Sequence, residues 1–177
     1  MEATESVARP DVTAAEPVGE DSAVPALIVV GSLILCLAGL AVSLYLTYEH
    51  YTGNSTLACS DTGVINCAKV TTSSSSRIFG IPVAVLGLAF FVPMLGLCLP
   101  AAWHSAKRSV HLVRTLLSAS GVAMIIYLLY AELFRVHAIC LWCTSVHVMT
   151  FLLFVLVWWA WSTGVGRGWE EIEAEAV

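Results

Sequence analysis

Long stretches of mainly apolar residues follow one another along most of the chain. Four of them have the length that a helix needs to cross a bilayer, about 20 residues; they are residues 24–48, 81–103, 112–133 and 140–162. Pro82 stands at the start of the second stretch, where a missing N–H is tolerated, and Pro93 inside it predicts a kink. The pattern predicts an all-α integral membrane protein, built as a bundle of four transmembrane helices.

The amino-acid composition excludes two further classes of protein. Hydrophobic residues make up 58% of the 177 residues and charged residues 12%, whereas soluble domains average about 45–50% and about 25%. A water-soluble globule of this size could not bury so much apolar surface, which excludes a soluble enzyme. The net charge is −5 and no basic stripe is present, so a nucleic-acid partner is excluded as well.

Charged residues mark the two ends of the chain and give it an orientation. Residues 1–23 carry six acidic residues and one basic residue and are predicted to be a disordered tail; residues 163–177 form a second acidic tail. Four spans place both tails on one side, which has five Lys and Arg against three on the other. The positive-inside rule therefore predicts a multi-pass protein of the cell (inner) membrane with both tails in the cytoplasm. Residues 24–162 would form one membrane domain, with an extracytoplasmic loop at residues 49–80 between the first two helices.

Four of the six cysteines fall on the predicted outer side. Cys59 and Cys67 lie in the long loop, and Cys140 and Cys143 open the fourth helix. Thiols on that side of a membrane form disulfides, so two static disulfides that brace the loop are one interpretation. The other two cysteines lie inside the first two spans, where they are expected to be small buried hydrophobic residues.

The spacing of Cys140 and Cys143 favours redox chemistry. Residues at i and i+3 of a helix are already neighbours, so a disulfide between them removes little chain entropy and stabilises little. A helix N-terminus lowers the pKa of a thiol, and the thiolate is the reactive form. No metal is expected, because the long spacing of Cys59 and Cys67 does not suit zinc, and Thr144 stands where a c-type haem motif has His.

Together the two cysteine pairs suggest a relay by thiol–disulfide exchange. A movable loop with Cys59 and Cys67 would react with a soluble partner and then with the second pair at the edge of the bilayer. A lipid quinone accepts two electrons, the number that a dithiol releases when it closes to a disulfide. His147 lies one helical turn beyond Cys143 on the same stripe and is a candidate to hydrogen-bond a quinone carbonyl. The alternative is a packed histidine bonded to a neighbouring helix.

The motifs and their order resemble the vitamin K epoxide reductase family, most closely its bacterial members. The resemblance extends over residues 24–162. It is carried by Cys59 and Cys67 eight positions apart with Asp61 and Gly63 between them, by Ser73, by Phe79-Gly80-Ile81-Pro82 ahead of Gly87, and by Cys140-Leu141-Trp142-Cys143. The other four-span quinone-linked thiol oxidases carry their Cys-x-x-Cys pair first, which is the opposite order.

The resemblance implies a role for each of the four outer cysteines. Cys143 would be the thiolate beside the quinone, and Cys140 would be its partner and the sulfur that the loop attacks. Cys67 would form the mixed disulfide with Cys140, and Cys59 would exchange with the external protein.

The resemblance also implies a quinone site, for menaquinone or ubiquinone. Ser73 matches a loop serine of the family that helps to hold the quinone. Ser76 and His147 stand where vertebrate members have an asparagine that contacts the quinone and a tyrosine, and both keep the ability to form hydrogen bonds. Helix capping or loop solvation is the alternative interpretation of Ser73 and Ser76.

In bacterial members the substrate is a thioredoxin-like disulfide-forming protein on the outer side, which the enzyme returns to its oxidised state. Few residues follow Trp161, so this partner is expected to be a separate protein. Two other functions stay open. One is a quinone or vitamin K epoxide reductase whose purpose is the reduced quinone, and the other is a non-catalytic four-span scaffold with static disulfides.

Overall fold

The computed structural model describes residues 24–53, 57–59 and 62–165. The predicted N-terminal acidic tail and almost all of the C-terminal one lie outside the described residues, so their disorder stays a prediction.

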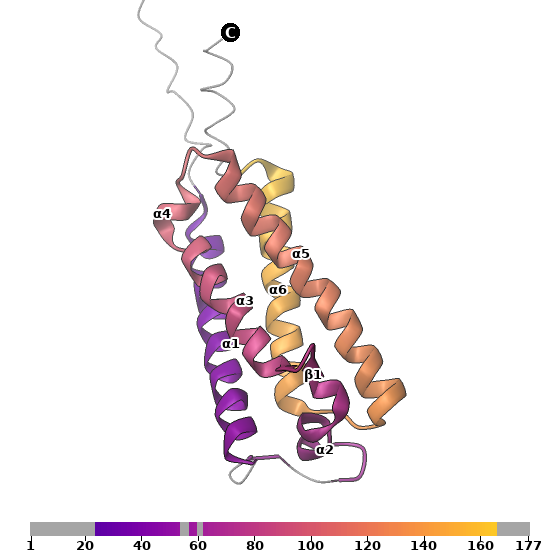
Figure 1. Ribbon diagram of the computed structural model, residues 1–177. Helices are drawn as coiled ribbons and strands as arrows, with labels where there is room; N and C mark the ends of the chain where they lie inside the picture. Colours follow the sequence, from indigo (N-terminus) through magenta and orange to yellow (C-terminus); the bar gives the residue numbers. More distant parts are fainter. Residues whose placement is uncertain (1–23, 54–56, 60–61, 166–177) are drawn as a thin grey trace, which may run out of the picture.

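Four helices run along one another and form the body of the protein (Figure 1). They are α1 (Ala26–Thr52), α3 (Val83–Leu97), α5 (Arg108–Tyr130) and α6 (Leu141–Thr163). Helix α1 packs against α3 and α6, and α5 packs against α6 and α3. Helix α1 begins and α6 ends at the same end of the bundle. The architecture is mostly helical, as the sequence predicts.

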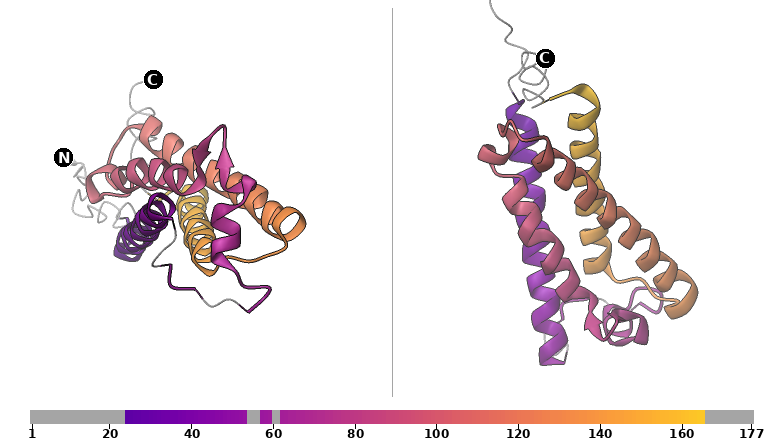
Figure 2. Two further views of the ribbon diagram at one scale, coloured as in Figure 1. Left: turned by 60° about the horizontal axis from the view of Figure 1, so that its bottom comes forward. Right: turned by 45° about the horizontal axis from the view of Figure 1, so that its top comes forward.

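Short elements complete the two ends of the bundle. The outer loop holds α2 (Cys67–Thr72), η2 (Ser74–Ser76) and a small antiparallel hairpin of β1 (Arg77–Ile78) and β2 (Ile81–Pro82). Helix α4 (Pro100–Trp103) lies at the opposite end, and the π-helical turn η3 (Ala131–Val136) extends α5. Figure 2 shows α2 lying across one end of the bundle, close to the end of α5 and the start of α6.

In the described part of the chain, three helical segments are long and apolar enough to cross a membrane: Ala26–Thr52, Arg108–Val136 and Leu141–Thr163. The predicted second span differs, because residues 81–103 do not form one helix. Helix α3 has only 15 residues and ends at Leu97, and α4 follows after a break. The helix continues through Pro93, so the break is not at that proline. It comes at Leu99, which is extended (φ −61°, ψ 149°) because the ring of Pro100 disfavours the helical conformation of the preceding residue.

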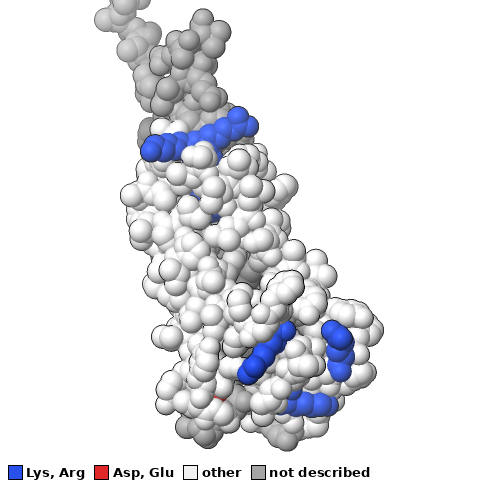
Figure 3. Space-filling model, viewed as in Figure 1, with Lys and Arg blue, Asp and Glu red and all other residues white. Residues whose placement is uncertain are grey.

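The surface of the bundle matches a membrane environment. Lys and Arg gather at its two ends on the face shown in Figure 3, and uncharged residues dominate between them. Large apolar side chains such as Leu27, Ile34, Leu116 and Phe151 are at least half exposed along the helices. Apolar side chains can stay exposed in this way where lipid, rather than water, surrounds them.

Close helix packing in the core depends on small residues. Cys36, Phe91, Met94, Cys98, Leu153 and Val157 form the central cluster, so the two cysteines inside the spans are buried as expected. A Cβ atom at Gly39 of α1 would lie 2.3 Å from the Phe91 ring of α3, and one at Gly121 of α5 would lie 2.8 Å from the Thr150 methyl group of α6. The lack of a side chain at Gly121 therefore lets α5 and α6 pack closely.

We expect Gly39→Ala to lower the free energy of unfolding by about 1–3 kcal/mol, since the new methyl group overlaps the Phe91 ring. Thermal unfolding in detergent measures the change. Gly96→Ala is the matched control, because a Cβ there meets nothing within 4 Å and alanine favours the helix. Equal stability of both variants would contradict the packing described here.

Candidate active site

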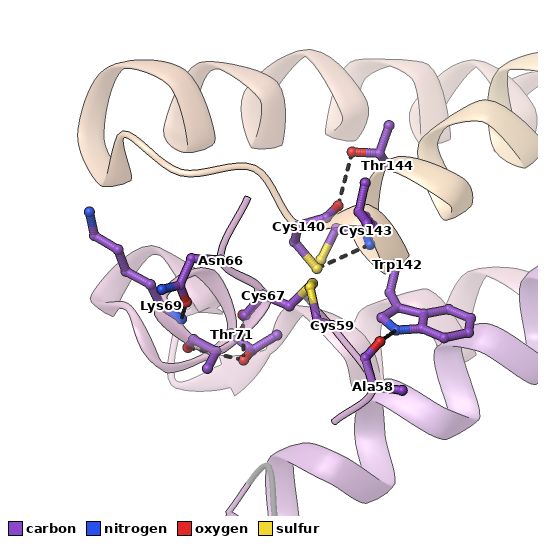
Figure 4. The surroundings of a disulfide bond; sticks show 12 residues. Ala58, Cys59, Asn66, Cys67, Lys69, Thr71, Cys140, Trp142, Cys143 and Thr144 are labelled. Carbon is purple, nitrogen blue, oxygen red and sulfur yellow. Dashed lines mark hydrogen bonds between the residues drawn. A yellow bond between two sulfur atoms is a disulfide. The ribbon is translucent and has the colours of Figure 1, made fainter. Parts of the chain in front are cut away.

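The four cysteines that the sequence places on the outer side meet at one end of the bundle (Figure 4). Cys59 and Cys67 form a disulfide, and Cys140 and Cys143 are free thiols. This end is opposite to the one where α1 begins and α6 ends. The sulfur of Cys140 points toward the disulfide.

A short backbone ladder holds the two pairs together. The Asn66 N–H donates to the Ile139 carbonyl (3.1 Å), and the Ile139 N–H donates to the Val64 carbonyl (2.8 Å). Residues 65 and 139 thereby form an isolated parallel bridge. Cys67 follows Asn66 and Cys140 follows Ile139, so the ladder sets these two cysteines beside each other.

Cys67 and Cys140 are both buried where they meet. Cys67 is 1% exposed and Cys140 is 0% exposed, and the two pack with Val70 and Ala138 in one apolar cluster. Cys59 is half-buried at the edge of this cluster. The outer sulfur that a second protein reaches most readily is therefore that of Cys59.

Trp142, between the two inner cysteines, anchors the segment that carries Cys59. Its indole N–H donates to the Ala58 carbonyl (2.9 Å), and the Ala58 N–H donates to the Tyr45 hydroxyl oxygen (3.0 Å). The rings of Tyr45 and Trp142 lie 5.0 Å apart between centroids. Sequence reasoning found no role for Trp142, because only the folded loop brings the Ala58 carbonyl to its indole.

The first turn of α6 makes Cys140 the electron-rich sulfur of the inner pair. Cys140 is the N-cap, and its sulfur accepts the Cys143 N–H at 3.3 Å. The Cys143 thiol also donates to this sulfur. These hydrogen bonds, the thiol contribution first, lower the pKa of the Cys140 thiol, although burial of the sulfur and the charge of Glu132 act against them. The predicted effect of a helix N-terminus on a thiol thus falls on Cys140.

Cys143 packs at the edge of the cluster of Cys67 and Cys140, and it also lines a cavity of about 410 Å³. The cavity is lined by α1, α3, α5 and α6, together with residues of α2 and η2. Its walls are mainly apolar, and its polar lining includes Cys143, Ser73, Ser76, His147 and Glu132. The structure therefore brings Cys143 and all three predicted quinone-site residues to one space, whereas Cys59, Cys67 and Cys140 do not line it.

The cavity suits a quinone in size, in wall chemistry and in one unsatisfied polar atom. Small-molecule sites typically have volumes of roughly 300–1,000 Å³ with apolar walls and a few polar groups. His147 is 7% exposed, and its Nδ1 atom has no hydrogen-bond partner in the described part of the chain. A buried imidazole nitrogen in this position can form a hydrogen bond with a quinone carbonyl, provided that Nδ1 carries the proton. The alternative interpretation is a histidine that forms a hydrogen bond with a neighbouring helix. In the described part of the chain, the Nδ1 atom of His147 forms no such bond.

Ser73 and Ser76 line the cavity, but their hydroxyl protons are engaged locally. The Ser73 hydroxyl donates to the Val70 carbonyl (2.8 Å), and the Ser76 hydroxyl donates to the Ser73 carbonyl (2.7 Å). Each hydroxyl has a single proton, so in this conformation neither donates to a ligand. These bonds match the alternative interpretation of the two serines as residues that close the end of α2 and the turn after it.

Sequence reasoning missed Glu132, a carboxylate that is 4% exposed and lines the same cavity. The available indication was its position as an acidic residue inside a predicted span, since ionisable residues within a membrane are candidates for function. That reasoning was applied to His147 and not to Glu132.

The comparisons with known proteins agree with the geometry of the site. The family model described as the vitamin K epoxide reductase family matches residues 31–158. No curated protein matches the chain significantly. The matched range holds both cysteine pairs, most of the length of the apolar helices and all residues that line the cavity, which supports a quinone-linked oxidoreductase of the membrane. The chain belongs to the vitamin K epoxide reductase family.

Proposed function

We propose that the protein oxidises a separate thioredoxin-like disulfide-forming protein and passes the electrons to a lipid quinone, menaquinone or ubiquinone. Electrons would enter at Cys59 and Cys67, move to Cys140 and Cys143, and leave to the quinone. The observation that carries the proposal is that Cys67 and Cys140 are packed together while Cys143 lines the cavity.

The proposal includes four membrane crossings with both chain ends in the cytoplasm. Helix α3 alone is about 22 Å long at 1.5 Å per residue, shorter than a hydrocarbon core of about 30 Å. Residues 98–103, including α4, continue from it toward the end where α1 begins, and together they would complete the second crossing. The cysteine pairs would then face the extracytoplasmic side.

The first step is an exchange with the partner protein. A thiolate of the reduced partner attacks Cys59, the S–S bond to Cys67 breaks, and a mixed disulfide joins the two proteins. The second thiol of the partner then displaces Cys59. The partner leaves with a disulfide, and Cys59 and Cys67 are left as a dithiol. The half-buried position of Cys59, against the burial of Cys67, favours attack at Cys59.

The second step moves the electrons inward. The Cys67 thiolate attacks Cys140 of an oxidised inner pair, and Cys143 is released. Cys59 then attacks Cys67, which restores the outer disulfide and releases Cys140. Leaving thiols with a low pKa depart faster, and the hydrogen bonds to the Cys140 sulfur lower its pKa. The products are an outer disulfide and an inner dithiol, which are the oxidation states in the structure.

The last step returns the inner pair to a disulfide. A quinone bound in the cavity supplies the oxidising power, because it takes up two electrons and two protons. Cys143 lies at the wall of this cavity, and His147 offers a polar contact about one helical turn deeper. The apolar walls would exclude water from the reacting sulfur.

The relay predicts which two cysteines can be trapped together. A Cys59→Ala/Cys143→Ala double variant should form a Cys67–Cys140 disulfide in most molecules after mild oxidation, since the two residues are already in contact. Mass spectrometry of peptides from non-reduced protein identifies the bond. The matched Cys59→Ala/Cys140→Ala variant keeps Cys143, which faces the cavity, and should give much less bond. Equal yields would contradict the assigned order of transfer.

Trp142→Phe should slow electron transfer from the partner by about 2- to 10-fold, since it removes one hydrogen bond worth about 0.5–1.5 kcal/mol from the anchored loop. Quinone reduction fed by a small dithiol that reacts directly with the inner pair should change little. Trp158→Phe, at an exposed position on the same helix, is the control. A loss of the same size with both electron donors would argue against an anchoring role for Trp142.

His147→Leu should raise the KM for quinone by about 2- to 10-fold, the effect of losing one hydrogen bond. Steady-state kinetics with a short-chain quinone measure it. His104→Leu, at the opposite end of the bundle, should leave the KM as it is. An unchanged KM in His147→Leu would remove His147 from the proposed quinone site.

A further inference from the structure

Glu132 is a buried carboxylate that the proposed mechanism does not use. It lies in the π-helical turn η3, which extends α5 inside an apolar candidate span. Such turns often occur at functional sites. A carboxylate in this environment is costly, and those that persist usually serve a function. The function of a buried carboxylate depends on the groups around it, which for Glu132 are those of the cavity and the inner cysteine pair.

Glu132 lines the cavity together with Cys143 and His147. Among the described residues that line the cavity, Glu132 is the only one with a carboxylate side chain. Its charge also interacts with both sulfurs of the inner pair, Cys140 and Cys143. Glu132 thus borders the space where a quinone would take up protons, and its charge reaches the thiols that give them up.

No Lys or Arg among the described residues lines the cavity beside Glu132. Lys69 on α2, Arg77 on β1 and Arg135 and His137 near η3 itself are all exposed. His50 also lines the cavity, and it contacts the Arg77 guanidinium at 3.4 Å. Within the site, the Glu132 charge acts on the two thiols, and His147 and His50 line the same cavity.

Two negative charges close together in a medium of low dielectric constant repel each other strongly. A carboxylate at Glu132 and a thiolate at the inner pair are such a combination. A thiolate at the inner pair therefore favours the protonated form of the Glu132 side chain. The three groups then share one negative charge, and a proton moves between them as the oxidation state changes.

We infer that Glu132 is the proton carrier between the inner thiol pair and the quinone, an assignment that rests on the proposed function. A proton from one inner thiol passes to the Glu132 carboxylate, which leaves a thiolate and a carboxylic acid. The two sulfurs then form a disulfide and release two electrons and the remaining thiol proton. The electrons, this proton and the proton of Glu132 go to the two quinone oxygens, and Glu132 returns to the carboxylate.

The first test is the rate of quinone reduction by the full chain in lipid nanodiscs, fed by a small dithiol and followed from about pH 5 to pH 9. Glu132→Gln keeps the shape of the side chain and removes its proton chemistry. Its rate should fall by about 100-fold or more, the usual contribution of a placed acid–base group, and Glu132→Asp should recover part of it. Glu49→Gln, which removes a buried carboxylate that does not line the cavity, is the control and should stay within a few-fold of wild type.

The second test measures the charge coupling itself and needs no turnover. The thiolate absorbance of Cys140, assigned by comparison with Cys140→Ser, is titrated in both proteins. The Glu132 charge raises the pKa of Cys140, so Glu132→Gln should move the titration to lower pH. A merely structural role would slow the enzyme without moving this titration.

The outcomes separate this inference from the proposed function. Wild-type protein that fails to reduce quinone with any dithiol would overturn the proposed function. Active wild type with an equally active Glu132→Gln variant, or with an unmoved Cys140 titration, would overturn the role of Glu132 alone. Slow quinone reduction together with a Cys140 titration at lower pH supports the inference.

Discussion

The structure of the site depends on two backbone hydrogen bonds between residues 64–66 and Ile139. They join the loop that follows helix α1 to Ile139, which lies shortly before helix α6. Cys67 and Cys140 come next in the two segments, so these bonds between distant parts of the sequence pack the two cysteines together. Residues 64–66 thus hold Cys67 beside Cys140 before the sulfurs react, which favours exchange.

The start of α6 gives the two inner cysteines different surroundings. Cys140 caps the helix and faces the loop disulfide, whereas Cys143, within the first turn, faces the cavity. Within one dithiol, Cys140 thus contacts the loop that would react with a protein, and Cys143 borders a cavity that could hold a lipid-soluble molecule. A scaffold with two static disulfides has no need of this division, and the free inner thiols do not fit it.

Much of this arrangement follows from the sequence, and the reasons are physical. Continuous apolar stretches predict membrane helices, and the Cys-x-x-Cys spacing places its pair at a helix start; family membership is confirmed. The prediction of one continuous helix over residues 81–103 was wrong because the effect of Pro100 on Leu99 was overlooked. The parallel bridge, the indole bond of Trp142 and the place of Glu132 at the cavity arise from tertiary contacts. No periodicity or local motif encodes these contacts, so only the folded chain reveals them.

The most direct test of the relay is a map of cysteine oxidation states in intact membranes, with and without depletion of quinone. Acid quenching and differential alkylation, read by mass spectrometry, give the state of each of the four outer cysteines. Quinone depletion should turn the Cys140–Cys143 pair into the dithiol first, and the Cys59–Cys67 pair should follow as the reduced partner accumulates. Oxidation states that do not respond to quinone, in either pair, would contradict the transfer of electrons from the loop through α6 to the lipid phase.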